Sequence, residues 1–407
     1  MVNQTEGYKR NQLIALSIVL MLACLFISRA ALSLSMIAFL VLTIVHNKIL
    51  SQLKAFINNR FLVSVAILFF IPLISYFWSS NKVEWADIAR IKFPLLFFPV
   101  AFAGSWQLKQ KDWQRIGFAF VFIMFLATCW SFYQYFSEYD ALNEAYLRSK
   151  TIRTPLEDDH VRFSWMVTCA VLCCVLLIRL KAGMKALLIF LASFFVIYLH
   201  VLSARMGLLS FYILLFVFGG WLLIEKRNKK LSFGLLAALV IMPLAAWFLA
   251  PTFRHRIQYF LYDISMVKNQ QYVSGSNDGT RIQSLQAGWD VLRNNPLGVG
   301  AGDLKSTIFQ WYEMNVPVMK EGEKFLPLSE LLVYGGFAGW PAVLILTVVL
   351  LLPLFMKIRY RVFWIGLNII IAFSFVFDIT IEAQFGVFIY LIMALWWWKW
   401  FSFKTNE

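Results

Sequence analysis

Charged residues are scarce in this sequence. Only 14% of its 407 residues are Asp, Glu, Lys or Arg, whereas 60% are hydrophobic, and the mean hydropathy is +0.70. This composition excludes an ordinary soluble domain, because long apolar runs with few charges are stable only where lipid replaces water. It predicts an all-α polytopic membrane protein, since helices satisfy their own backbone hydrogen bonds in lipid.

The residue patterns of common metal, nucleotide and hydrolase sites are also missing. No His, Cys and carboxylate cluster has metal-ligand spacing, there is no G-x-S-x-G motif, and the glycine-rich run 298–302 has no Walker lysine. We therefore expect no metal and no cofactor. All five cysteines lie inside apolar runs, as small buried side chains do, and form no disulfide framework: Cys24, Cys129, Cys169, Cys173 and Cys174.

Twelve apolar runs approach the roughly 20 residues that a membrane-crossing helix needs. Lys9 and Arg10 precede the first run, as in a signal peptide, but no small-x-small cleavage site follows, and we expect a retained helix. The fourth run is short and carries Pro94 and Pro99, so we expect a kinked or re-entrant segment there. The predicted spans are 11–28, 30–46, 61–78, 92–106, 115–136, 162–179, 184–202, 205–225, 231–250, 328–356, 360–378 and 381–402.

Positive charge is concentrated on one side of these spans. If the N-terminus is cytoplasmic, the cytoplasmic segments hold 20 of the 37 basic residues and four of the 22 acidic ones, about +16 net against about −1 on the other side. Cytoplasmic loops carry such an excess of Lys and Arg. We therefore assign the net charge of +15 to these loops, including Lys226–Lys230, and not to a nucleic-acid partner. Both termini are then cytoplasmic, and the indoles of the run 396–400 lie at the inner interface.

The long polar stretch 251–327 then faces outward. It divides the chain into nine spans in 1–250, a periplasmic loop that caps the candidate active site, and three spans with a cytoplasmic tail in 328–407. Two shorter outer segments accompany it: residues 79–92, read as an interfacial helix that carries Arg90, and residues 137–162, which carry Glu157-Asp158-Asp159-His160. Internal repeats are absent, which weakens a secondary-transporter interpretation.

Two arginines of the outer side stand out. Arg205 opens the eighth span, where it either reaches lipid headgroups or binds an anion together with the free N–H groups of the helix start. Arg281 opens a second amphipathic helix whose apolar face is Ile282, Leu285, Trp289 and Leu292, with Asp278 or Thr280 as the N-cap. A cation is disfavoured in a first helical turn, so an anionic ligand gives Arg281 a reason to be there, against the alternative of a solvated surface arginine. Arg254 and Arg256 either meet headgroups or contact the ligand.

These features together resemble the O-antigen ligase and O-antigen polymerase superfamily of bacterial membrane glycosyltransferases. The residues that carry the resemblance are Ser203-Ala204-Arg205-Met206-Gly207 at a helix start, the large outer loop, and Arg281 and Gly288-Trp289 followed by 295–302, together with the twelve-span topology. The resemblance implies a GT-C-like fold in the bacterial inner membrane with the active face periplasmic. It also implies an undecaprenyl-diphosphate-linked glycan donor whose diphosphate the arginines bind, and an inverting transfer to an acceptor hydroxyl. On this basis Arg205 and Arg281 are expected to be catalytic, and Arg254, Arg256, Arg90, His160 and Trp289 to bind substrate.

The sequence departs from that family at one position. A histidine thought to act on the acceptor hydroxyl normally precedes the helix after the large loop, whereas residues 325–336 here contain none. Glu330 is the first candidate to replace it, with helix capping as the alternative role, and His160 is the second candidate. A third option is that leaving-group departure runs ahead of attack and no base is needed.

The acceptor stays open among lipid A-core, a growing glycan and a protein hydroxyl. Two other classes remain as alternatives: a lipid-linked glycan flippase or other transporter, and a family member that binds glycan lipid without catalysis. A transporter predicts ionisable residues inside several spans, and the sequence has essentially none.

Overall fold

The computed structural model describes residues 2–46, 48–148, 150–156, 159–225, 228–268 and 274–402. Lys226 and Arg227 of the predicted cytoplasmic loop, and Glu157 and Asp158 of the outer loop, lie outside them. Every regular element in the described ranges is helical, which confirms the predicted all-α class for this part of the chain.

The helices follow the apolar runs closely. Each predicted span contains a helix, and the described residues between the spans contain six more α-helices. The α-helices of the runs are α1 (Val2–Cys24), α2 (Arg29–Ile44), α4 (Arg60–Ile74), α6 (Pro94–Phe102), α7 (Gln110–Ser137), α9 (His160–Arg179), α10 (Lys185–Leu202), α11 (Arg205–Ile224), α12 (Lys229–Leu249), α16 (Glu330–Leu351), α17 (Arg361–Phe377) and α18 (Gln384–Phe401). The others are α3 (Ile49–Ile57), α5 (Lys82–Lys92), α8 (Tyr139–Tyr146), α13 (Pro251–Lys268), α14 (Asn277–Asn294) and α15 (Leu304–Asn315), with 3-10 turns at Ser75–Phe77, Glu321–Glu323 and Leu352–Phe355.

Seven helical segments in the described residues are long and apolar enough to cross a membrane, or eight if α2 and α3 form one bent span. This supports a helical membrane protein, while the count of twelve and the GT-C-like fold stay predictions. The predicted fourth span is α6, whose nine residues extend about 13 Å, less than half of a hydrocarbon core of about 30 Å. It cannot cross alone, in keeping with the proline-based expectation. The seven segments are Arg60–Phe77, Gln110–Ser137, His160–Arg179, Lys185–Leu202, Arg205–Ile224, Lys229–Leu249 and Glu330–Phe355.

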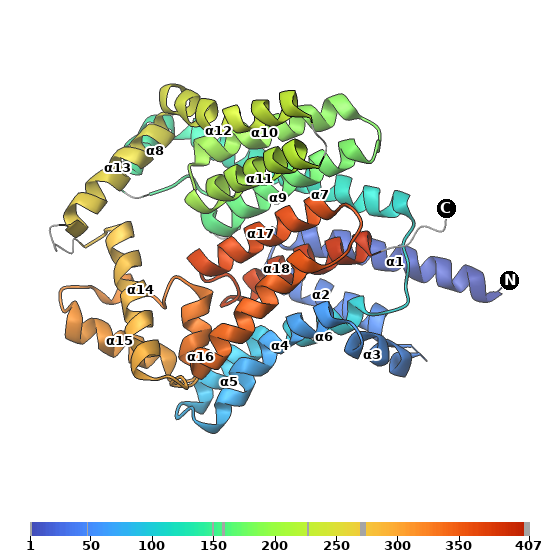
Figure 1. The fold of residues 1–407 in the computed structure, drawn as a ribbon, viewed down its shortest axis with the longest axis horizontal. Coiled ribbons are helices and arrows are strands. Elements are labelled where there is room, and N and C mark those ends of the chain that lie inside the picture. Colours follow the sequence, from blue (N-terminus) through green and yellow to red (C-terminus); the bar gives the residue numbers. More distant parts are fainter. Residues whose placement is uncertain are drawn as a thin grey trace.

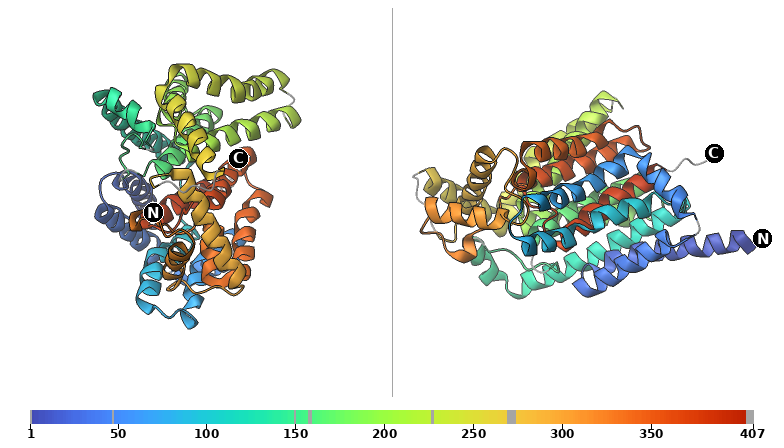
Figure 2. Two further views of the ribbon diagram at one scale, coloured as in Figure 1. Left: turned by 90° about the vertical axis from the view of Figure 1, so that its left-hand side faces the viewer. Right: turned by 90° about the horizontal axis from the view of Figure 1, so that it is seen from below.

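The long helices run side by side along the longest axis of the molecule (Figures 1 and 2). The start of α1 and the end of α18 lie toward one end of this bundle, and α13, α14 and α15 lie at the opposite end. The segment 251–327 therefore forms a helical cap on the end away from the termini, as the topology prediction requires.

Helix α18 forms the core of the bundle, with 15 of its 18 residues buried. The indoles of Trp396, Trp397 and Trp400 are almost completely inside protein, and Trp400 stacks on Trp113 of α7. These indoles therefore contact protein and not lipid, while the depth of the run at the inner interface stays a prediction. Its rings fill the bundle interior, where large aromatic side chains bury the most apolar area.

Helix α14 differs from its prediction in two respects. Its N-cap is Ser276, whose hydroxyl accepts from the N–H of Gly279 at 2.8 Å, so the helix begins at Asn277 and Arg281 lies just beyond the first turn. Its buried face is built by small residues, Ser284, Ala287 and Gly288 among them, because α14 packs closely against α16 and Pro327. The predicted apolar face instead points partly outward, with Trp289 50% exposed.

Candidate functional site at the capped end of the bundle

Three arginines from three different helices line one cavity of about 480 Å³ between the cap and the bundle. They are Arg205 at the start of α11, Arg256 on α13 and Arg281 on α14. The lining also includes His160 at the start of α9 and Asp378 at the end of α17. We call this space the arginine cavity. It brings together four of the eight residues that the sequence nominated.

Arg205 is held in the cavity by a carboxylate. Its two terminal nitrogens contact the two oxygens of Asp278 in α14, one of them at 2.7 Å, and its guanidinium lies 4.7 Å from the centre of the Phe260 ring. A bidentate ion pair of this kind fixes the plane of the guanidinium. Arg205 thus joins the bundle to the cap and does not simply reach for headgroups.

Arg256 and Arg281 carry N–H groups without partners. The Nε and Nη1 atoms of Arg256 and the Nη2 atom of Arg281 are buried and make no hydrogen bond. Arg256 as a whole is only 8% exposed, so water does not reach these two nitrogens. Burial, followed by the like charge of Arg205, lowers the pKa of Arg256. Burial also lowers the pKa of Arg281, and Asp378 opposes that shift. Because arginine stays charged in proteins, these are two buried cations at one cavity, each with N–H groups that lack a partner.

An apolar groove of about 260 Å³ adjoins the arginine cavity between α11 and α13. Arg205 and Arg256 line both spaces, so the groove begins where the cations are. The rest of its lining is mainly apolar: Ser203, Leu208, Leu209, Tyr212, Phe253, Ile257 and Phe260. An anion with a long apolar tail matches this combination of surfaces.

Asp378 is a cavity residue that the sequence argument missed. It follows the last residue of α17 and lies in the connection to α18, outside the membrane-spanning helices. Burial raises the pKa of its carboxyl, whereas Arg162 and Arg281 act in the opposite direction. In the sequence, Asp378 is marked only as an acidic residue directly after an apolar run. That pattern is the same for an acid that merely follows a helix and for an acid that lines a binding site.

Glu330 does not line the cavity. It is the first residue of α16 and is completely buried. Its Oε2 accepts from the backbone N–H groups of Thr380 at 2.8 Å and Ile381 at 3.3 Å. Its carboxylate therefore does not cap its own helix and does not reach the cavity where an acceptor would bind. It binds the backbone of the connection between α17 and α18 instead.

The other nominated residues lie elsewhere. Arg254 is exposed on α13, and the side chain of Arg90 is 76% exposed and pairs with Asp87 on α5 at 3.4 Å. Trp289 lines a separate open groove of about 420 Å³ between α14 and α15, together with Asp290 and Trp311. The substrate-binding roles of Arg254, Arg90 and Trp289 stay predictions, and none of the three contributes to the arginine cavity.

Comparison with known proteins adds no name to this site. No model of a protein family matches the sequence, and no curated protein matches it.

Proposed function

We propose that this protein is a membrane glycosyltransferase of the O-antigen ligase or polymerase type. It moves a glycan from an undecaprenyl-diphosphate donor to an acceptor hydroxyl, with inversion, on the periplasmic face of the bacterial inner membrane. The observation that carries the proposal is the convergence of Arg205, Arg256 and Arg281 on one cavity, with unpaired guanidinium N–H groups on the last two. Phosphate oxygens are the ligands that such forks bind best.

The apolar groove supports a lipid-linked donor over a soluble phosphate. Since it starts at Arg205 and Arg256, a diphosphate bound there extends its polyprenyl chain between α11 and α13. The glycan then occupies the arginine cavity, under the cap formed by α13 and α14. This cap limits access of water to the reacting carbon, which suppresses hydrolysis of the donor.

The arginines act on the leaving group. The acceptor oxygen forms a bond to the anomeric carbon while the bond from that carbon to the diphosphate oxygen breaks, and its electron pair goes to the diphosphate. Guanidinium groups already in place stabilise this charge without reorganising at the moment of reaction. Catalysis of this kind needs neither a covalent intermediate nor a cofactor.

The test is glycan transfer by the purified protein in proteoliposomes. The donor is undecaprenyl-diphosphate glycan, and the acceptors are lipid A-core, a glycan and a protein, each assayed separately. We expect transfer to one of them. Arg281→Ala should lower the rate about 30- to 1000-fold, equivalent to about 2–4 kcal/mol of lost stabilisation, and Arg281→Lys should recover only part of it.

Arg293→Ala is the matched control, because Arg293 is exposed in the last turn of α14, the helix that carries Arg281, and lies outside the cavity. Movement of the glycan lipid across the vesicle without transfer would identify a flippase instead. Donor binding without transfer to any acceptor would identify a non-catalytic binder. Wild-type transfer by Arg281→Ala would contradict the assigned role of the arginines.

A further inference from the structure

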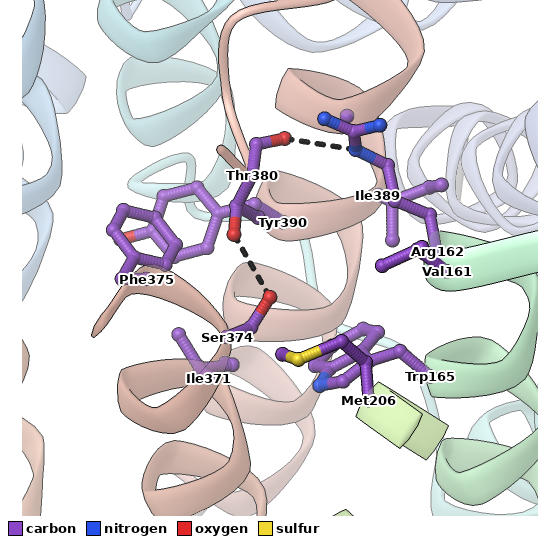
Figure 3. Close-up of a pocket in the computed structure, with 11 residues that line it drawn as sticks. Val161, Arg162, Trp165, Met206, Ile371, Ser374, Phe375, Thr380, Ile389 and Tyr390 are labelled. Atoms are coloured by element: carbon purple, nitrogen blue, oxygen red, sulfur yellow. Dashed lines mark hydrogen bonds between the residues drawn. The ribbon is translucent and has the colours of Figure 1, made fainter. Parts of the chain in front are cut away.

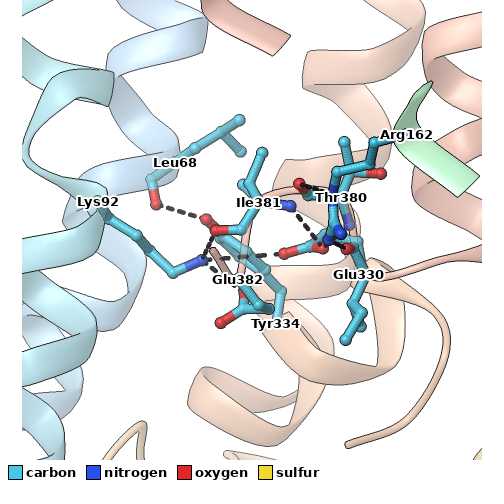
Figure 4. Close-up of polar contacts among 9 residues, drawn as sticks. Leu68, Lys92, Arg162, Glu330, Tyr334, Thr380, Ile381 and Glu382 are labelled. Atoms are coloured by element: carbon cyan, nitrogen blue, oxygen red, sulfur yellow. Dashed lines mark hydrogen bonds and ion pairs between the residues drawn. The ribbon is translucent and has the colours of Figure 1, made fainter. Parts of the chain in front are cut away.

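The connection between α17 and α18 (residues 378–383) is fixed by charged side chains from three helices, and two of these side chains are completely buried (Figure 4). Lys92, at the end of α5, donates to the carbonyl of Ile381 at 3.1 Å and contacts Glu382 at 2.5 Å. Glu330, from α16, accepts from two backbone N–H groups of the connection, and its Oε1 lies 3.9 Å from Lys92. Lys92 and Glu330 are both completely buried, so neither can exchange its partners for water.

The third charged residue that holds the connection, after Lys92 and Glu330, is Arg162 of α9. Arg162 donates through Nε to the carbonyl of Thr380 at 3.3 Å and also contacts the carbonyl of Ile379, while Asp159 holds its guanidinium. The hydroxyl of Thr380 lies 2.8 Å from that of Ser374, beside a cavity of only about 10 Å³ (Figure 3). That space holds one water at most, so the connection is packed and the cavity takes no substrate.

The first residue of this connection is Asp378, the buried carboxylate of the arginine cavity. The backbone N–H of Glu330 donates to the backbone carbonyl of Asp378 at 3.2 Å, so the contacts that hold the connection include the backbone of Asp378 itself. Burying two carboxylates and a lysine is expensive even when they are paired. The fold retains this cost at the segment that presents Asp378 to Arg281, although apolar side chains would pack the same space more stably.

We propose that Asp378 accepts the proton of the acceptor hydroxyl, and that Lys92, Glu330 and Arg162 are positioning residues that hold its carboxylate in the arginine cavity. This inference rests on the proposed function. As the acceptor oxygen bonds to the anomeric carbon and the diphosphate leaves with its electron pair, the proton moves from that oxygen to the carboxylate. The resulting carboxylic acid then returns the proton to solvent. Asp378 thus takes the role for which the resemblance implies a histidine that residues 325–336 lack.

Burial supports this assignment, because a carboxyl with a raised pKa is a better proton acceptor near neutral pH. The charged groups that act on Asp378 are Arg281 of α14, Arg162 of α9 and Asp159 at the N-cap of α9. The other titratable residues that line the same cavity are His160, Arg205, Arg256, Asp278 and Glu323. The carboxylate form is the active one, so the transfer rate should fall as pH falls through the pKa of Asp378.

The experiment uses the same proteoliposome assay. Asp378→Asn keeps the shape of the side chain, and we expect kcat to fall about 100-fold or more, the acid limb of the pH profile to disappear, and binding of undecaprenyl diphosphate to stay within about threefold. Asp140→Asn, an exposed acid of α8, is the matched control. Wild-type kcat in Asp378→Asn would overturn the proposal. An acid limb that persists there and disappears in His160→Gln would assign the proton to His160. In either case the transfer function itself would stand.

The positioning role has its own readout. Glu330→Gln should lower kcat about tenfold with little change in the KM for the donor, and should have almost no further effect in the Asp378→Asn background, because it acts through that carboxylate. A purely structural role would instead lower protein stability equally in both backgrounds and leave kcat per folded molecule unchanged. Glu144→Gln, on the exposed face of α8, controls for the change of charge.

Discussion

At the residue scale, replacing Arg256 should affect protein stability and glycan transfer in opposite directions. Its guanidinium is buried, two of its nitrogens make no hydrogen bond, and Arg205 repels it. Replacing an unpaired buried cation by an apolar side chain of similar size removes a desolvation cost of about 1–3 kcal/mol. We therefore expect Arg256→Met to unfold at the same or a higher temperature than the wild type while transferring glycan far more slowly.

Thermal unfolding of the detergent-solubilised protein checks this expectation, with transfer measured on the same preparation. A large loss of stability in Arg256→Met would mean that the guanidinium supports the fold through contacts of its own, and its role as an unpaired ligand group would have to be abandoned.

The sequence identified the arginines but not their acidic partners. Arg205 is the first residue of α11 and Arg281 lies near the start of α14, and the sequence shows both beside the start of an amphipathic or apolar segment. The pair of Arg205 with Asp278 joins residues 73 positions apart, and Asp378 reaches the cavity only because α17 ends beside α14 and α16. Glu330 was nominated for its place in the chain, whereas its direction is set by the backbone of residues 380–381.

At the element scale, apolar runs predicted where the helices lie, and close packing decided which face each one buries. Helix α14 illustrates the limit. Periodicity selected Ile282, Leu285, Trp289 and Leu292 as its inner face, and of these Leu292 is buried while Trp289 is half exposed. The small side chains around Gly288 let α16 and Pro327 approach more closely on another side of the helix. Tertiary packing overrides a hydrophobic stripe when small residues allow a shorter distance between helices.

The turn after α14, at Gly298, packs against the break in α16 and so attaches the cap to the bundle. Gly298 has φ +81°, and a Cβ atom there would lie 2.6 Å from the amide nitrogen of Ala338, where α16 breaks. We expect Gly298→Ala to destabilise the protein by at least about 1–2 kcal/mol, since it adds a left-handed alanine to a steric clash. Gly234→Ala, in α12 with open space around the new Cβ, should be neutral or slightly stabilising. Equal unfolding temperatures for the two variants would show that the cap is not anchored at this turn.

At the scale of the whole molecule, the prediction from charge distribution is the orientation in the membrane. Lys229 begins α12, while Asn277 begins α14 in the cap. In a variant without the five native cysteines, a membrane-impermeant maleimide added to intact cells should label Asn277→Cys and leave Lys229→Cys unlabelled. The reverse pattern would place the arginine cavity in the cytoplasm and remove the periplasmic mechanism.

The number of membrane-crossing helices is the feature of the architecture that the apolar runs of the sequence predict least well. Hydropathy finds the apolar runs, but α6 is too short to cross and α18 is enclosed by other helices, so neither has the length and exposure of a simple span. How such segments are placed depends on their neighbours in the bundle, which a window of sequence does not contain.

The most direct test of the central claim is the binding of undecaprenyl diphosphate, without a glycan and without an acceptor, to the purified protein. Arg256 lines the cavity, whereas Arg293 is exposed in the last turn of α14 and lies outside it, so Arg256→Met and Arg293→Met remove the same charge at the two places. We expect Arg293→Met to bind as the wild type does and Arg256→Met to bind about tenfold or more weakly, because it loses one charge-assisted contact. Equal affinities for the two variants would contradict the account, because the lipid diphosphate would then bind somewhere other than the arginine cavity.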